Sequence, residues 1–297
     1  MIMPLKGFRC ATCGGSGNFL VMDDPGALCL SCADLDHLVF LSAGNAALSR
    51  RARTHSTFQG SPGSPRAIAS LCDDARVTDE ELTGGVLTDQ VAYYRRRADE
   101  YDVTAYGDDV AAARALIARL VAEMRPVGSV LEIACGTGLW TEALAVWADT
   151  VTAIDAAPEM VAIARDRVQS ANVSFEVADV FSWHSATRFE VVFFSAWLSH
   201  VPASWFERFW QLLRTLLAGG GRVLFIDEHV DERGKEAYVA GQEEVVERQL
   251  GDGSTFRVIK NFVEPEELKL RLGRMGWDCE IRRVSSRWVY GEARLTR

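Results

Sequence analysis

Residues 130–140, VLEIACGTGLW, decide the fold of this chain. A short apolar run leads into a turn with two glycines, and a segment of helical character follows. This order predicts a buried strand, a tight turn and a helix, the first unit of a parallel α/β sheet. A ligand that lies across the carboxyl end of such a sheet must approach the turn backbone closely. Glycine permits this approach because it has no Cβ.

The turn differs from the GxGxxG pattern of dinucleotide-binding sites. Ala134 stands where that pattern has its first glycine, and Glu132 places an acid within the end of the strand. The sequence also has no GxxxxGK[ST] phosphate-binding loop. A glycine turn alone does not identify the ligand, because nicotinamide enzymes use a similar turn.

Helical and strand-like segments alternate from about residue 84 onward. This alternation predicts an α/β fold with a doubly wound, mostly parallel sheet of seven strands. The expected strands are residues 129–134, 150–154, 173–177, 191–194, 222–226, 255–261 and, as a last strand or hairpin, 279–295. The expected helices are residues 90–101, 109–124, 140–147, 158–170, 205–217, 235–250 and 265–275.

Composition divides the chain into three parts and sets limits on its partners. Residues 1–56 form a cysteine-containing module, residues 57–83 have the Gly, Ser and Pro content of a linker, and residues 84–297 form the α/β domain. The net charge of −9 disfavours a broad electrostatic grip on nucleic acid. The sequence has neither a membrane-spanning apolar run nor a secretory signal, so we expect a cytoplasmic protein with no membrane partner.

Two CxxC pairs in the first part predict a zinc site. Cys10 and Cys13 form one pair, Cys29 and Cys32 the other. Four thiolates at this spacing are typical of a tetrahedral structural Zn²⁺ site, and the metal would supply folding energy to a module with little core. The alternative is four packed thiols without metal. The segment resembles a zinc ribbon, a kind of module that often contacts nucleic acid or protein.

Residues 130–140 resemble motif I of the class I, Rossmann-like S-adenosylmethionine-dependent methyltransferases, in the form E-x-A-C-G-T-G. The resemblance extends to the ends of the next three expected strands and implies S-adenosyl-L-methionine as cofactor. It implies that Asp155 binds the ribose hydroxyls, that Met160 packs on the adenine and that Asp179 accepts from the adenine amino group. The full expected cofactor set is Tyr94, Arg97, Glu132, Ala134, Cys135, Gly136, Gly138, Asp155, Ala156, Met160, Asp179, Val180 and Ser195.

Some members of this set have simpler interpretations. Glu132 is alternatively a strand-end acid that caps a turn, and the position of Cys135 requires only a small side chain. Residues 91–102 resemble the lid helix of small-molecule methyltransferases, in which Tyr94 and Tyr101 close over the cofactor and Arg97 pairs with its carboxylate. The alternative is a solvated basic helix anchored by its aromatic residues.

The expected chemistry is methyl transfer, for which the protein aligns the acceptor and excludes water. A base is needed when the acceptor is a hydroxyl, a thiol or a protonated amine. His200, in the loop after the fourth expected strand, is the candidate, because imidazole titrates near neutrality. Alternatively His200 binds the loop backbone. Residues 227–229, Asp-Glu-His, are a second acid/base cluster, for which solvation is the simpler explanation.

We expect a small-molecule acceptor for O- or N-methylation. An RNA methyltransferase that docks substrate through the zinc module and residues 50–53 is the alternative, and a catalytically silent adaptor is a third hypothesis. Residues 195–198, Ser-Ala-Trp-Leu, lack the N-P-P-Y type motif that binds exocyclic base amines. The complete set of expected cofactor residues argues against the silent adaptor.

Overall fold

The computed structural model describes residues 8–13, 16–17, 21–23, 26–28, 79–262 and 264–296. The chain divides into two compact units, residues 1–76 and residues 77–297. In the first unit, β1 (Phe8–Arg9) pairs with β2 (Ser16–Gly17), β3 (Val21–Asp23) pairs with β4 (Gly26–Leu28), and β1 contacts β4. Helix α3 of the second unit begins at Asp79, inside the segment that we had assigned to the linker.

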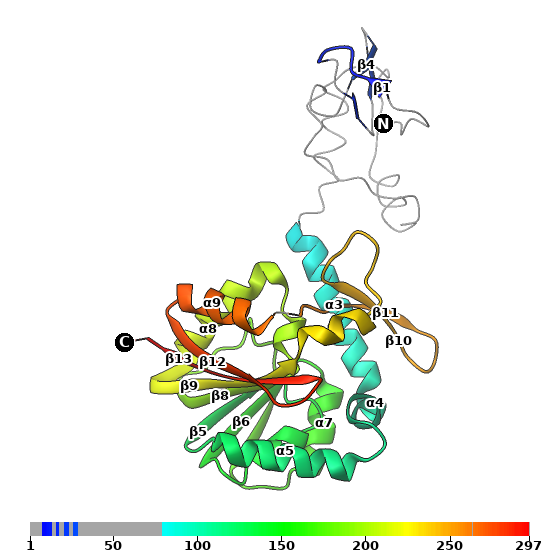
Figure 1. The fold of residues 1–297 in the computed structure, drawn as a ribbon. Helices are drawn as coiled ribbons and strands as arrows, with labels where there is room; N and C mark the ends of the chain where they lie inside the picture. Colours follow the sequence, from blue (N-terminus) through cyan, green and yellow to red (C-terminus); the bar gives the residue numbers. More distant parts are fainter. Residues whose placement is uncertain are drawn as a thin grey trace. The chain divides into compact units, whose positions relative to one another are not determined.

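A mostly parallel seven-stranded sheet forms the centre of the second unit, as predicted (Figure 1). Its strands differ from the expected set in two places: the strand expected at 255–261 lies outside this sheet, and residues 279–295 belong to two of its strands. Its strand order is β12-β13-β9-β8-β5-β6-β7, in which β5 to β9 run parallel. β13 is antiparallel to both of its neighbours, β9 and β12, so β12 has the same direction as β5 to β9. The order reverses between β5 and β8, which creates a crevice at the carboxyl ends of these two strands. The strands are β5 (Ser129–Ile133), β6 (Thr150–Asp155), β7 (Val173–Val177), β8 (Phe189–Ser195), β9 (Leu217–Glu228), β12 (Trp277–Arg283) and β13 (Trp288–Leu295).

Helices cover both faces of the sheet because both faces of its strands are apolar. Along β8, Phe193 points into the core that α5 and α6 cover, whereas Phe194 points into the core beneath α8 and α9. Figure 1 shows α5 on one face and α8 and α9 on the other. The helices are α3 (Asp79–Arg97), α4 (Tyr101–Tyr106), α5 (Val110–Met124), α6 (Leu139–Leu144), α7 (Pro158–Arg167), α8 (Phe206–Leu216) and α9 (Pro265–Arg274), with short 3₁₀ turns η1 (Ala98–Glu100), η2 (Leu198–His200), η3 (Ala203–Trp205) and η4 (Val230–Lys235).

The helix that we predicted over residues 235–250 is wrong. Only η4 reaches Lys235, and the segment ends in β10 (Val245–Gln249), which pairs antiparallel with β11 (Thr255–Ile259). Gly241 has a φ of 79°, which no helix accommodates, and the β-branched pair at 245–246 favours a strand. Val246 is fully buried in an apolar cluster with Tyr93 of α3. Helix α3 and the β10–β11 hairpin therefore pack together, and we call them the cap.

Gly291 is essential for packing β13 against β9. A Cβ at this position would lie 2.0 Å from Cζ of Phe225, whose fully buried ring stacks on Phe194. We predict that Gly291→Ala lowers the free energy of unfolding by about 3 kcal/mol, measured by urea denaturation. Gly273→Ala in α9 is the control, because a Cβ there meets nothing and alanine favours a helix. Wild-type stability of Gly291→Ala would contradict this packing.

Candidate functional site

A cavity lies at the carboxyl ends of β5, β6 and β8, with residues of α3 and α4 also on its wall. Most of the residues that we predicted to bind a ligand line this cavity. The lining residues are Leu87, Gln90, Val91, Tyr94, Tyr101, Ile133, Ala134, Gly136, Ile154, Asp155, Ala156, Ala157, Met160, Ala178, Asp179, Val180, Phe181, Ser195, Ala196, Trp197 and His200.

The turn after β5 brings main chain to the cavity in a left-handed conformation. Ala134 and Gly136 have φ angles of 55° and 54°, and both line the cavity. Gly138, with a φ of 84°, lies outside the lining and precedes α6. A Cβ on Gly138 would lie 3.0 Å from Cβ of Ala164, so this glycine lets α7 pack closely against the turn. The two glycines of the motif therefore serve different purposes.

Asp155 at the end of β6 connects the loops on two sides of the cavity. Its Oδ2 accepts a hydrogen bond of 2.9 Å from the amide of Gly136, and its Oδ1 accepts one of 2.8 Å from the amide of Ala157. Burial raises the pKa of this carboxyl, whereas the two amides oppose the increase. A carboxylate has about four acceptor positions, so Asp155 keeps acceptor capacity for hydroxyl groups in the cavity.

Two residues of motif I lie behind the cavity and do not line it. Glu132 is 2% exposed, and its Oε2 accepts a hydrogen bond of 2.6 Å from Oγ1 of Thr141. Burial raises the pKa of Glu132 to about 8. Cys135 is also buried, and burial raises the pKa of its thiol well above the ordinary value. Both side chains support the turn from the core.

The cap contributes Tyr94 to the cavity wall, and the adjoining α4 contributes Tyr101, the second tyrosine that we expected there. Arg97 is not among the lining residues. Its Nε donates to Oγ1 of Thr104 at 2.9 Å, and its guanidinium carbon lies 5.0 Å from the centre of the Tyr101 ring. Arg97 thus supports Tyr101, and its contacts with Thr104 and the Tyr101 ring hold it away from the cavity although it lies three residues after Tyr94.

His200 is held at both ring nitrogens. Its Nδ1 lies 2.7 Å from the carbonyl oxygen of Ile259, and its Nε2 lies 2.9 Å from the hydroxyl of Tyr94. Because a carbonyl only accepts, Nδ1 carries the proton and Nε2 accepts from Tyr94. Burial, together with the charge of Lys260, lowers the pKa of His200 well below its usual range. The ring is therefore neutral at neutral pH, with its basic nitrogen facing a cavity-lining hydroxyl.

The acid/base cluster at residues 227–229 lies outside the cavity and joins structural elements. Asp227 accepts from the amide of Ser199 at 3.1 Å, and Glu228 forms ion pairs with Lys260 and, at 2.8 Å, with Arg287. Burial alone would raise the pKa of Glu228, but these two cations hold it at about 2.

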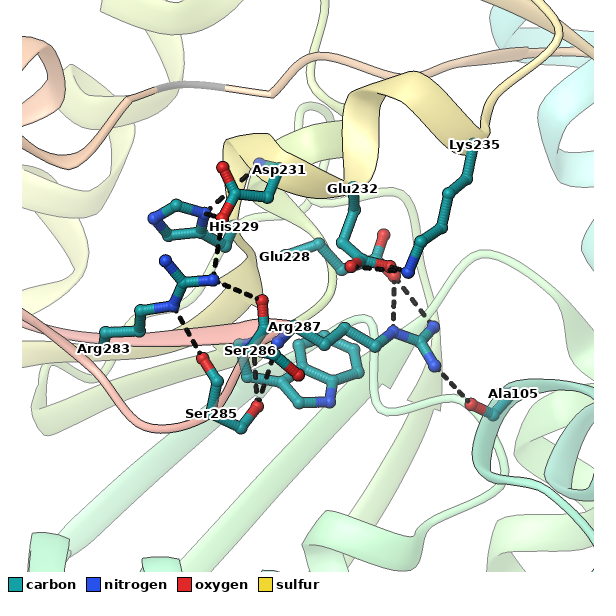
Figure 2. A network of polar contacts seen from close by, with 11 residues as sticks. Ala105, Glu228, His229, Asp231, Glu232, Lys235, Arg283, Ser285, Ser286 and Arg287 are labelled. Atoms are coloured by element: carbon teal, nitrogen blue, oxygen red, sulfur yellow. Dashed lines mark hydrogen bonds and ion pairs between the residues drawn. The ribbon is translucent and has the colours of Figure 1, made fainter.

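The cluster continues along the surface beside the β12–β13 hairpin. Figure 2 shows Arg287 between Glu228 and the carbonyl of Ala105, 3.5 Å away, which connects the hairpin to α4. In the same view Arg283 pairs with Asp231 at 2.8 Å. Through these contacts the charged cluster connects the loop at Ser199, the β12–β13 hairpin and α4. Its role is therefore structural.

Two of the four cysteines of the predicted zinc site lie among the described residues of the first unit. Cys10 is buried and Cys13 is exposed in the turn after β1, whereas Cys29 and Cys32 lie outside the described residues. Within the part of the chain that the structure describes, no three His, Cys, Asp or Glu side chains gather to hold a metal ion. None of the described helices has the length and apolar character needed to cross a membrane.

Several cavity residues were missed by sequence reasoning. Leu87, Gln90 and Val91 belong to α3, which begins before the helix that we predicted from residue 90. Gln90 precedes Tyr94 by one helical turn, so an extension of the lid helix toward the N-terminus would have placed it on the same face. Phe181 lies shortly after the predicted strand at 173–177, but no local pattern distinguishes a wall residue from a core residue there.

Glu132 makes the stability of this domain pH-dependent. Because its pKa rises from an ordinary 4.5 to about 8 on folding, the folded state retains a proton that the unfolded state releases. The stability linked to this proton is complete below about pH 4.5 and is lost as the pH rises through about 8. We predict that urea unfolding at pH 6 and pH 8 shows a smaller loss for Glu132→Gln than for wild type. Glu142→Gln, a change on the outer side of α6, should keep the wild-type loss; equal losses in all three would contradict the assignment.

The comparisons with known proteins agree with this geometry. The family model described as "Methyltransferase domain" matches residues 130–221. A solved complex of DhpI with S-adenosyl-L-homocysteine (SAH) is 39% identical, with a TM-score of 0.63, and the match covers 72% of this chain and 98% of DhpI. A second solved structure, the DhpI-SAM-HEP complex, is 40% identical, with a TM-score of 0.62 and coverage of 71% of this chain and 98% of DhpI.

Curated relatives match over shorter parts of their length. The "Ubiquinone biosynthesis O-methyltransferase" of Xanthomonas axonopodis pv. citri is 31% identical over 54% of this chain and 66% of its own length. The "Malonyl-[acyl-carrier protein] O-methyltransferase" of Paenibacillus sp. strain JDR-2 is 34% identical over 46% and 52%. The chain thus spans about half to two thirds of the length of these two relatives. With the sheet order, the turn and the near-complete coverage of DhpI, these matches show that the chain belongs to the class I S-adenosylmethionine-dependent methyltransferases.

Proposed function

We propose that this enzyme methylates a protic oxygen or nitrogen atom of a small-molecule acceptor. The observation that carries the proposal is the Tyr94–His200 hydrogen bond on the wall of the same cavity as Asp155. Two relatives are named as O-methyltransferases, and one of the DhpI complexes has a third component, HEP, beside SAM. These relatives support a small acceptor for this chain.

The cavity residues fit S-adenosyl-L-methionine. Asp155 keeps acceptor positions for the ribose hydroxyls, and Met160 and Val180 offer apolar surface for the adenine, beside Asp179 for its amino group. The left-handed turn at Ala134 and Gly136 allows main chain to approach the ligand closely. The bound cofactor supplies a methyl group that its sulfonium already activates.

The side chains of Tyr94 and His200 give the acceptor proton a route. An acceptor that donates to the Tyr94 oxygen loses its proton to that oxygen as the Tyr94 proton moves to Nε2 of His200. Burial raises the pKa of Tyr94 well above 10, so the hydroxyl starts the reaction protonated. Leu87, Val91 and Trp197 form an apolar wall that excludes water from the acceptor.

We predict that His200→Asn lowers methyl transfer by about 100-fold and leaves the Kd for SAM within about threefold. Asparagine keeps a donor for the Ile259 carbonyl but lacks Nε2. Transfer of labelled methyl from SAM is measured with pooled small hydroxyl, carboxyl and amine compounds and, separately, with total RNA. His184→Asn, at a histidine outside the cavity lining, is the control.

Each outcome of this assay has a defined meaning. Labelling of a small compound that depends on His200 and not on His184 supports the proposal. Undiminished transfer by His200→Asn would contradict the base role. Labelling confined to RNA would replace the small acceptor with the RNA alternative, and SAM binding without transfer to any pool would favour the silent adaptor.

For the first unit we propose a structural Zn²⁺ site formed by Cys10, Cys13, Cys29 and Cys32. Cys10 directly follows β1, Cys29 directly follows β4, and these two strands contact each other. Four thiolates at this spacing suit tetrahedral Zn²⁺, and residues 1–56 would form a separate module around it.

The zinc proposal predicts about one zinc per chain in the purified full-length protein, measured by elemental analysis. The double variant Cys10→Ser/Cys13→Ser should lose the metal, and Cys72→Ser, outside both CxxC pairs, should keep it. A metal-free chain whose N-terminal residues still give dispersed amide NMR signals would contradict the proposal, because the metal is expected to supply the folding energy.

A further inference from the structure

Gln90 joins three segments that are far apart in sequence. It lies on α3, is 3% exposed and lines the cavity. Its Nε2 donates to the carbonyl of His200 at 3.3 Å, and its Oε1 accepts from the amide of Ile259 at 3.0 Å. Because a main-chain carbonyl only accepts and a main-chain amide only donates, these partners fix the orientation of the glutamine amide.

Ile259 presents its polar main-chain groups away from the β10 strand. It faces Val245 across the hairpin, while the next residue, Lys260, donates its amide to Glu244 at 2.7 Å. The amide and the carbonyl of Ile259 would therefore form an open strand edge, and buried main-chain groups require partners. Gln90 binds the amide and Nδ1 of His200 binds the carbonyl.

The side chain of Gln90 thus contacts both main-chain segments that fix the His200 imidazole, namely its own backbone and that of Ile259. Gln90 binds the main chain of His200 itself and the residue whose carbonyl receives the Nδ1 proton. Tyr94, the partner of Nε2, is one helical turn after Gln90 on the same helix. The position of α3 therefore sets both the direction of Nε2 and the position of the hydroxyl that it faces.

We propose that Gln90 is a positioning residue for methyl transfer, which keeps His200 in the Nδ1–H tautomer with Nε2 directed at Tyr94. The proposal rests on the base role of His200 given above. Gln90 transfers no proton itself and acts through the two main-chain groups that it binds. Sequence reasoning did not single out this residue.

The test is ¹⁵N NMR of the full chain labelled in its histidine rings, of which there are five. His200→Asn identifies the His200 signals. In wild type we expect the Nδ1–H tautomer of His200. In Gln90→Met we expect the ratio of the two tautomers to change by about fivefold or more, which corresponds to the loss of about one hydrogen bond. The Kd for SAM should stay within about threefold. Unchanged His200 signals in Gln90→Met would overturn the proposal.

Asp89→Asn is the matched control. Asp89 precedes Gln90 on α3 and pairs with Arg257 of β11 at 2.8 Å, so its removal loosens the same packing and leaves the hydrogen bonds of Gln90 in place. The His200 signals should stay at their wild-type positions in this variant. An equal change in Asp89→Asn would overturn the proposal, because it would show a general effect of cap packing.

A measurement on wild type keeps the proposal testable even if Gln90→Met does not fold. The amide of Ile259 should exchange with solvent far more slowly than an unprotected peptide, because its acceptor is the buried Gln90. Exchange at the unprotected rate would overturn the proposal. The base role fails separately, through undiminished transfer by His200→Asn, whatever the ring signals of Gln90→Met show.

Discussion

The carboxylate of Asp155 holds together the two loops on which the cavity depends. It accepts one hydrogen bond from the amide of Gly136, in the turn after β5, and another from the amide of Ala157, at the start of α7. Both amides come from main chain that borders the cavity, where a ligand would lie against it. The strand order reverses beside this point, so the crevice between β5 and β8 opens next to a fixed negative charge. A ligand with vicinal hydroxyls meets complementary acceptors there.

The second half of the site comes from the cap. Helix α3 and the outer edge of β11 both contact η2. Hydrogen bonds among Gln90, Ile259 and His200 satisfy main-chain groups that would otherwise be buried without partners. The hydrogen bond between Tyr94 and His200 connects this group of residues to the cavity. Apolar packing of Tyr93 on Val246 and Val258 holds the helix and the hairpin together. The side of the cavity around Asp155 and the side formed by the cap therefore belong to different parts of the fold, joined across one cavity.

Sequence patterns predicted the central sheet because its strands are short apolar runs bounded by glycine or by helices. They also indicated four residues that line the cavity, Ala134, Asp155, Met160 and Asp179, because the motif positions fall in the loops and helix start that follow consecutive strands. The helix expected at 235–250 was wrong because a strand at 245–249 is stabilised there by packing against Tyr93, more than a hundred residues away. For the same reason Gln90 escaped notice, since its partners are 110 and 169 residues distant along the chain. Arg97 shows that helical spacing alone does not decide which side chains reach a cavity.

The central claim is that this cavity binds S-adenosyl-L-methionine through Asp155. Calorimetric titration of the wild-type chain and of Asp155→Asn with SAM, and of wild type with NAD, tests it most directly. The expected result is binding of SAM but not NAD by wild type, and about 100-fold weaker binding by the variant, as expected for charge-assisted hydrogen bonds to two hydroxyls. Absence of SAM binding by wild type, or equal affinity in Asp155→Asn, would contradict it.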